Sequence, residues 1–395
     1  HDLAGAARLS CPDLAVDELL PRLTLRFKRH RLLVKWRGSL FRIIHDRGEC
    51  LDGEQSNFIA PFSEIALQQN TGKPESLFDL ALALSDRTDW RQIGLSRGDI
   101  ALSALGAPSR PGRRKARSCA IGEKESCGKA FEKVMEESLA QFLANDPSVI
   151  GDTAEAVHQS RVAIRRLRAG LRAFKPVLPP RERKAFNADF RWLQQALGQS
   201  RDWHVFQSET LPAIAGLDNA QRKSLDELAN RQQAKGLTAA IEALASRRAT
   251  RLILRFQHWL HMLAEGDGSL ERPARKLAAR LARRSFRRLA AAGPLDTRRP
   301  MAEIHAIRIR GKQLRYALEF FAALEALAPF MPALPALKAL QTHLGNANDA
   351  AVALKLLSGD IRTPLAPTGR DTIERWAAAR IIDCVAEARP ALAHI

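Results

Sequence analysis

The sequence matches itself at an offset of 147 residues, and this repeat restricts the possible folds more than any other feature. Two stretches show the match, and their spacing is the same in both copies: residues 157–174 align with 304–321, and residues 193–205 align with 340–352. A single offset that serves two separate stretches is hard to obtain by chance. We therefore expect two copies of one structural unit, related by approximate two-fold symmetry.

The first stretch of each copy combines an apolar face with a row of positive charges. Apolar residues recur at spacings of three and four, which is typical of the buried face of a helix. Basic residues recur at the same spacings on another face; they are His158, Arg161, Arg165, Arg168 and Arg172 in the first copy, and His305, Arg308, Lys312 and Arg315 in the second. Like charges at these spacings repel one another, so we expect an anionic ligand along the row.

The net charge of +19 is distributed unevenly along the 395 residues. Residues 1–105 contain 14 Lys and Arg and 14 Asp and Glu, so the whole basic excess lies in residues 106–395. This asymmetry predicts a basic module that follows a neutral one and binds a polyanion.

The periodicity predicts a mainly α fold with two pseudo-symmetric helical repeats, after a small N-terminal α+β region. The expected domains are residues 1–105, a basic flexible linker at 106–128, and a helical domain at 129–395 with repeats at about 129–265 and 273–395. Strands are expected at 23–27, 31–36, 40–45 and 59–68, and a helix at 74–84. In the helical domain we expect helices near 129–145, 153–175, 181–198, 200–213, 219–235, 237–264, 273–291, 301–327, 333–357 and 371–389. Asp152 and Glu155 form a potential capping box.

The doubled basic motif resembles the CHAD domain, the conserved histidine α-helical domain. In this family a His is followed by Arg at the third residue and by Arg or Lys at the seventh, twice per domain, as at His158 and His305. The resemblance covers about residues 125–395. It implies a pair of pseudo-symmetric four-helix bundles with a basic surface, binding of inorganic polyphosphate, and association with polyphosphate granules.

Residues 45–85 read HDRGECLDGEQSNFIAPFSEIALQQNTGKPESLFDLALALS. This passage resembles the second half of a CYTH domain, a triphosphate tunnel metalloenzyme, and the resemblance covers roughly residues 22–105. It implies a partial β-barrel in this region. The family's opening Glu-x-Glu-x-Lys strand has no counterpart before Arg22, and Gln68 and Gln69 stand where further carboxylates are expected. Glu64 and Asp46 alone are few ligands for a divalent ion. We expect a truncated, non-catalytic scaffold, with triphosphatase activity of this region as the alternative.

Other helices add candidates for polyphosphate binding. These are Arg166, Arg201, Arg251, Arg255, His258, Lys276, Arg280, Arg283 and Arg287. Whether all these groups face one groove is left open by the sequence. Asp202 and Asp349 occupy equivalent places in the second repeated stretch, and we expect each to pair with an Arg or to cap a helix. The pKa of the leading histidines is expected to rise beside a bound polyanion.

Several classes of function are disfavoured by the composition. No catalytic residues, metal ligands or cofactor motifs stand out, so we expect a binding module and not an enzyme. There is no apolar run long enough for a membrane span. Five dispersed cysteines favour a reducing, cytoplasmic protein. The sequence has one Tyr and six Trp, few platforms for stacking bases, so a nucleic acid is the alternative partner.

Overall fold

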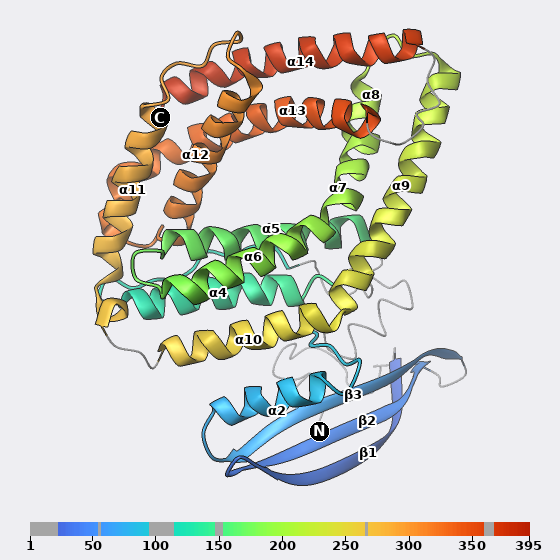
Figure 1. Ribbon diagram of the computed structural model, residues 1–395, viewed down its shortest axis with the longest axis vertical. Coiled ribbons are helices and arrows are strands. Elements are labelled where there is room, and N and C mark those ends of the chain that lie inside the picture. Colours follow the sequence, from blue (N-terminus) through green and yellow to red (C-terminus); the bar gives the residue numbers. More distant parts are fainter. Residues whose placement is uncertain (1–22, 54–56, 95–113, 147–152, 265–267, 359–366) are drawn as a thin grey trace, which may run out of the picture. The chain divides into compact units, whose positions relative to one another are not determined.

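The computed structural model describes residues 23–53, 57–94, 114–146, 153–264, 268–358 and 367–395 (Figure 1). The chain divides into two compact units: the first contains the described residues 23–81, and the second contains residues 82–94 and all described residues from 114 onward. Asp152, the proposed start of a capping box, lies outside the described residues. The predicted fold class is confirmed, because the structure is mainly helical with a small N-terminal sheet.

The first unit is built on an antiparallel sheet of order β1-β2-β3. Strand β1 spans Leu23–Trp36, β2 spans Ser39–Asp52 and β3 spans Phe58–Thr71, and helix α2 follows at Glu75–Ser85. Arg37 and Gly38 have positive φ angles of 46° and 79° and make the tight turn between the first two strands.

The strands are longer than predicted, and the reason is a buried ion pair. Asp46, Arg47 and Gly48 were expected to end the second strand, but they lie inside β2. The Arg29 guanidinium donates two hydrogen bonds of 2.8 Å to the Asp46 carboxylate, which is fully buried. This cross-strand pair holds a residue that usually favours turns within the ladder. The two strands predicted at 23–27 and 31–36 are one continuous strand.

The first repeat of the helical unit contains four helices that pack together. They are α4 (Cys127–Leu143), α5 (Thr153–Ala173), α6 (Pro180–Ala196) and α10 (Arg247–Ala264) (Figure 1). Between α6 and α10 the chain forms α7 (Gly198–Val205), the π-helix η2 (Phe206–Thr210), α8 (Leu211–Ala213) and α9 (Asn219–Ala245). Helix α7 packs along α9.

The second repeat contains α11 (Ala274–Ala290), α12 (Met301–Phe320), α13 (Leu334–Ser358) and α14 (Pro367–Ala393), with the 3₁₀ segments η3 (Gly268–Glu271) and η4 (Glu325–Ala333). The offset of 147 residues places α11 on α4 and α12 on α5. The repeats meet at equivalent residues, because the rings of Phe174 and Phe321 lie 5.3 Å apart in one shared core.

One helix boundary differs from the prediction because of a glycine. Gly236 was expected to separate two helices, but it lies inside α9, which continues to Ala245 and ends at Ser246. A Cβ atom at Gly236 would lie 2.6 Å from the backbone nitrogen of Ser200 in α7. This glycine therefore allows the close approach of two helices and does not break one.

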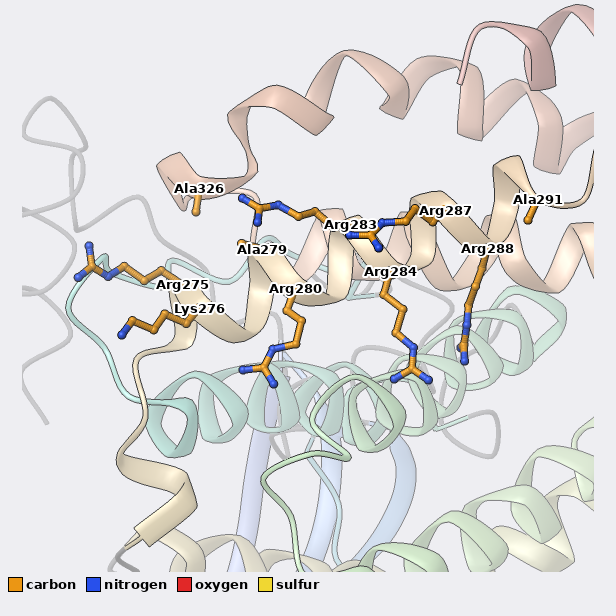
Figure 2. Close-up of a pocket in the computed structure, with 10 residues that line it drawn as sticks. All are labelled: Arg275, Lys276, Ala279, Arg280, Arg283, Arg284, Arg287, Arg288, Ala291 and Ala326. Carbon is orange, nitrogen blue, oxygen red and sulfur yellow. The ribbon is translucent and has the colours of Figure 1, made fainter.

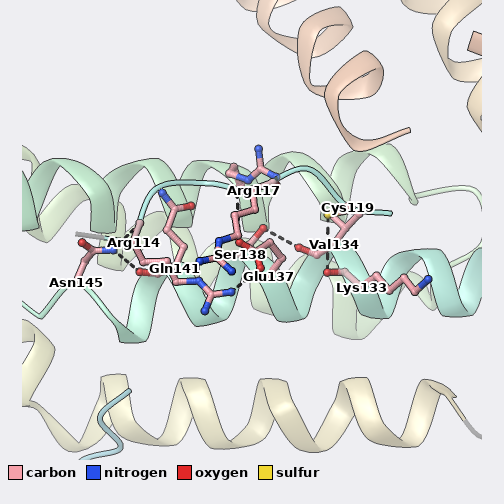
Figure 3. Close-up of polar contacts among 10 residues, drawn as sticks. Arg114, Arg117, Cys119, Lys133, Val134, Glu137, Ser138, Gln141 and Asn145 are labelled. Atoms are coloured by element: carbon pink, nitrogen blue, oxygen red, sulfur yellow. Dashed lines mark hydrogen bonds and ion pairs between the residues drawn. The ribbon is translucent and has the colours of Figure 1, made fainter. Parts of the chain in front are cut away.

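The second half of the predicted flexible linker is packed against α4 (Figure 3). Arg114 donates a 2.6 Å hydrogen bond to Glu137, and Asn145 donates to the Arg114 carbonyl at 2.9 Å. Cys119 and Ile121 are buried in the main core. Residues 114–126 are therefore a structured part of the helical unit, since two apolar side chains and buried polar partners fix them. The first half of the predicted linker, 106–113, lies outside the described residues.

Candidate anion-binding site

The two basic rows meet in one pocket of about 270 Å³, which we call the inter-repeat pocket. Helices α5 and α7 of the first repeat and α12 and α13 of the second line it. Both members of several repeat-related pairs are present: Arg161 with Arg308, Arg165 with Lys312, Asp202 with Asp349, Arg201 with Asn348, and Val205 with Val352. The pocket therefore lies where the approximate two-fold axis relates the repeats.

The equivalent arginines Arg161 and Arg308 each have a buried nitrogen without a partner among the described residues. These atoms are Nη1 of Arg161 and Nε of Arg308. A buried donor that lacks a hydrogen bond costs about 1–3 kcal/mol. Both guanidinium groups also line the pocket, so an acceptor that enters it can satisfy these donors once the side chains reorient.

One of the two carboxylates of the pocket contacts an arginine, and the other lies near one. Asp202 Oδ1 lies 3.5 Å from Arg161 Nη2, as predicted for this acid. Asp349 lies in the field of Arg308 and accepts a 3.4 Å hydrogen bond from Asn348. The pKa of both acids is raised, first of all by burial.

A glycine makes room for the first of these arginines. A Cβ atom at Gly198, the first residue of α7, would lie 3.1 Å from Arg161 Nη1. Nothing lies within 4 Å of the corresponding position at Gly345, inside α13. Gly198 therefore leaves the space that the Arg161 guanidinium occupies, whereas the equivalent Gly345 has no such role.

Burial and mutual repulsion lower the pKa of the pocket's bases. Burial, followed by the charge of Arg201, lowers the pKa of His158 to about 4. Burial, followed by the charges of Arg308 and Arg165, lowers the pKa of Lys312 to about 7. In the unliganded protein His158 is neutral at pH 7, and Lys312 is only partly protonated. An anion in the pocket offsets the repulsion from the neighbouring arginines. It therefore raises the pKa of His158 and of Lys312 and favours their protonation.

Other predicted ligands on α5 and α12 do not line this pocket. His305 is exposed, and Arg172 is exposed at the end of α5. Arg168 donates to Asn187 and Gln194 of α6, and Arg315 lies 3.6 Å from Glu319. The structure thus places one of the two leading histidines in the pocket and leaves the other outside it.

Arg166 is part of the core. It is 5% exposed, its guanidinium lies 5.2 Å from the centre of the Phe320 ring, and it donates a hydrogen bond to the Arg117 carbonyl. These contacts join α5 to α12 and to the segment before α4. Arg166 therefore holds protein elements together.

The remaining predicted rows also lie outside the inter-repeat pocket. On α10, Arg251 pairs with Asp86, and Arg255 lies 5.9 Å from the Phe186 ring; His258 lies on the same helix. On α11, Lys276, Arg280, Arg283 and Arg287 line a separate open groove. The rows on α5 and α12 thus share a pocket, and those on α10 and α11 do not join it.

Sequence reasoning missed some residues of both surfaces. The apolar wall of the inter-repeat pocket includes Phe206 and Leu356, which the basic pattern does not indicate. The α11 groove also contains Arg275, Arg284 and Arg288. The spacing of four residues from Arg280 to Arg284 and Arg288 is the signal that identifies this second row.

The described part of the chain contains neither a cluster of metal ligands nor a disulfide bond. Within it, no three His, Cys, Asp or Glu side chains come together as potential metal ligands. Four cysteines in the described ranges, Cys50, Cys119, Cys127 and Cys384, are free and buried. No described helix has the length and apolar character needed to cross a membrane.

Comparisons with known proteins agree on the helical domain. The family model described as the CHAD domain matches residues 133–358. The crystal structure of the CHAD domain from the plant Ricinus communis is 29% identical, with a TM-score of 0.60, over 72% of this chain and 98% of that one. PptA from Streptomyces chartreusis is similar in fold, with 20% identity and a TM-score of 0.54, over 68% of this chain and 98% of that one. A search of curated protein sequences found no match.

Proposed function

Because the chain belongs to the CHAD domain family, we propose that its helical unit binds inorganic polyphosphate in the inter-repeat pocket. One observation carries the proposal: Arg161 and Arg308, equivalent residues of the two repeats, line one pocket, and each has a buried nitrogen without a partner among the residues that the structure describes. Phosphate oxygens are suitable acceptors for such guanidinium groups.

A linear phosphate polymer fits the symmetry of the pocket. Its units are identical, so similar cation pairs from the two repeats can hold successive units. Arg161 with Arg165 supplies one pair, and Arg308 with Lys312 supplies the other. Binding stabilises the protein by reducing the repulsion among these cations.

The pocket is suited to binding more than to catalysis. Its carboxylates lie near arginines, and Asp202 pairs with Arg161. Its bases are cations or groups that become cations when an anion enters. We propose a non-enzymatic module that acts in the cytoplasm, on polyphosphate granules. A sequence-independent nucleic-acid binder is the second candidate, because phosphodiester backbones present similar oxygens.

The N-terminal unit is proposed to be a CYTH-like scaffold without triphosphatase activity. Asp46 and Glu64 are cross-strand partners in β2 and β3, but Asp46 already accepts two hydrogen bonds from Arg29. A carboxylate engaged in this way is a poor metal ligand. Release of phosphate from triphosphate with Mg²⁺ or Mn²⁺, abolished by Glu64→Gln, would contradict this part of the proposal.

Calorimetric titration of the full chain with long-chain polyphosphate tests the main proposal. The wild type is compared with Arg161→Ala/Arg308→Ala and with a control, Arg231→Ala/Lys235→Ala, which removes two exposed cations of α9. We expect the pocket variant to lose at least tenfold in affinity and the control to stay within about twofold of the wild type.

Two results would contradict the proposal. One is the absence of polyphosphate binding at low salt, and the other is equal loss in the pocket and control variants. Competition with single-stranded RNA separates the two candidate ligands: polyphosphate should displace RNA readily, and RNA should displace polyphosphate poorly.

A further inference from the structure

Helix α11 differs sharply in charge from the helix that occupies its place in the first repeat. The offset of 147 residues places Cys127–Leu143 of α4 directly on Ala274–Ala290 of α11. Helix α4 has two lysines and three glutamates, whereas α11 has six arginines, one lysine and no acidic residue. The fold at this position does not require a basic helix, since the first repeat builds the same element with a net negative charge.

The contrast is a reversal of charge at two adjacent positions. The positions of Glu136 and Glu137 in α4 correspond to Arg283 and Arg284 in α11. Like charges three and four residues apart destabilise a helix by about 0.2–0.5 kcal/mol per pair. The cations therefore oppose the stability of the helix that carries them, which points to a ligand.

The basic residues of α11 form what we call the α11 stripe. Its members are Arg275, Lys276, Arg280, Arg283, Arg284, Arg287 and Arg288. All seven are exposed, and they line an open groove of about 1010 Å³ together with Ala279, Ala291 and Ala326. Figure 2 shows that the side chains of Arg280, Arg284 and Arg288 extend toward one side of the helix.

The stripe has no acidic partner within the described residues. None of its seven side chains makes an ion pair or hydrogen bond there, and no acidic side chain lines the groove. By contrast, the exposed arginines Arg247 and Arg248 of α10 pair with Asp89 and Asp189. The stripe is therefore a continuous row of seven exposed cations that no acid neutralises among the described residues.

The stripe and the inter-repeat pocket lie on different faces of α12. Arg308 and Lys312 line the pocket, while Arg310 donates a hydrogen bond to the Arg288 carbonyl of α11. Two residues correspond to about 200° around a helix, so the residue that meets α11 points away from the pocket. A ligand in the groove is consequently not the same phosphate unit as one in the pocket.

We propose that the α11 stripe is a second, separate binding surface for linear inorganic polyphosphate, used by a part of the polymer outside the inter-repeat pocket. The proposal rests on the proposed function of that pocket. No aromatic residue lines the groove, and Phe286 of α11 packs inward, 6.2 Å from the Phe330 ring. A polymer without bases suits this surface better than a single-stranded nucleic acid, which gains from stacking.

If one polymer binds at both surfaces, the affinity of the protein for polyphosphate should depend on the length of the polymer. A long chain can occupy both surfaces, which increases the overall affinity through effective concentration. Tripolyphosphate is too short to pass around α12, because a helix with side chains is about 10–12 Å wide. The stripe should therefore contribute to binding of long chains and not to binding of tripolyphosphate in the pocket.

The first repeat supplies the substitutions for the test. Arg283→Glu/Arg284→Glu gives α11 the residues that α4 has at these places, and Arg231→Glu/Lys235→Glu on α9 changes the net charge by the same amount. Both variants of the full chain are titrated with long-chain polyphosphate, tripolyphosphate and single-stranded RNA, beside the pocket variant Arg161→Ala/Arg308→Ala. Circular dichroism and thermal unfolding verify the fold of each variant.

We expect the α11 variant to bind long chains at least tenfold more weakly than the α9 control, with a salt slope reduced by about 2. Its affinity for tripolyphosphate should stay within twofold of the control. Long-chain affinity equal to that of the control would overturn the stripe proposal but leave the pocket intact. If the α11 variant lost affinity for RNA but not for long-chain polyphosphate, the ligand of the stripe would be a nucleic acid and not polyphosphate. A wild-type protein that does not bind polyphosphate would contradict both proposals.

Discussion

Arg161 of α5 and Arg308 of α12 are equivalent residues of an internal repeat, and they line the same pocket. Each has one nitrogen that is buried and without a partner in the described structure. Two helices separated by 147 residues thus present similar donors to one volume of space. Under the proposed function, this relationship accounts for the presence of a cationic row in both repeats, since both copies would contribute to one site.

Single substitutions of the two arginines should have similar effects on polyphosphate binding. Arg161→Ala and Arg308→Ala each remove one hydrogen bond to a charged group, which contributes about 1.5–3 kcal/mol. We expect each variant to bind about 10- to 100-fold more weakly by calorimetry. A large effect at one site with no effect at the other would contradict the shared use of the pocket.

The adjacent residues Arg165 and Arg166 should separate binding from stability. Arg165 lines the pocket, whereas Arg166 is buried against Phe320. Arg166→Ala is expected to lower the free energy of unfolding by about 1–3 kcal/mol and to leave the affinity of the folded protein near that of the wild type. Arg165→Ala should do the opposite. Urea unfolding and calorimetry on both variants test this, and reversed effects would refute the assignment.

Binding should weaken as the pH rises above about 7 because of Lys312. Its pKa is lowered to about 7 by burial and by Arg308, Arg165 and Arg315, with Asp349 opposing the shift. A bound polyanion raises this pKa, so binding above pH 7 takes up a proton and affinity falls by up to about tenfold per pH unit.

Titrations between about pH 7 and 9 measure this dependence. Lys312→Arg keeps a positive charge over the whole range and should remove most of the slope while retaining binding. A wild-type affinity that does not change with pH, or a slope that persists unchanged in Lys312→Arg, would exclude Lys312 as the group that takes up the proton.

Gly198 and Gly345 are equivalent residues of the second repeated stretch, so their substitution by alanine gives a matched pair of variants. In Gly198→Ala the new Cβ lies 3.1 Å from Arg161 Nη1, so the guanidinium must shift and polyphosphate binding should weaken several-fold. In Gly345→Ala the new Cβ meets no atom within 4 Å. We expect this variant to bind like the wild type and to be more stable by about 0.5–1 kcal/mol, as is usual for a helix interior. Equal binding by both variants would contradict the role of Gly198.

The internal repeat and the helical periodicity were enough to predict a mainly α architecture of two repeats, because both are patterns in the sequence itself. The offset that pairs Arg161 with Arg308 also pairs Arg165 with Lys312 in the same pocket, although it pairs His158 with His305, which lies outside it. Contacts between distant segments were not predictable in this way. Gly236 reads as a helix end, but its role depends on Ser200 of a neighbouring helix. Asp46 reads as a turn residue, but Arg29 holds it in a strand.

The surface on which each basic residue lies could not be predicted from the sequence either. Periodicity places residues on one face of a helix, but it does not say what that face meets. Arg166 therefore resembled a ligand although it packs on Phe320, and His305 resembled His158 although it is exposed. The row on α11 was recognised, but its position on the other side of α12 from the pocket required the structure.

The central claim is that one polyphosphate chain is held between the two repeats. An experimental structure of the full chain with bound polyphosphate tests it most directly. We expect oxygens of a single polyphosphate molecule at about 2.7–2.9 Å from Nη1 of Arg161 and from Nε of Arg308. Density for polyphosphate elsewhere on the protein, with the inter-repeat pocket empty, would contradict the claim.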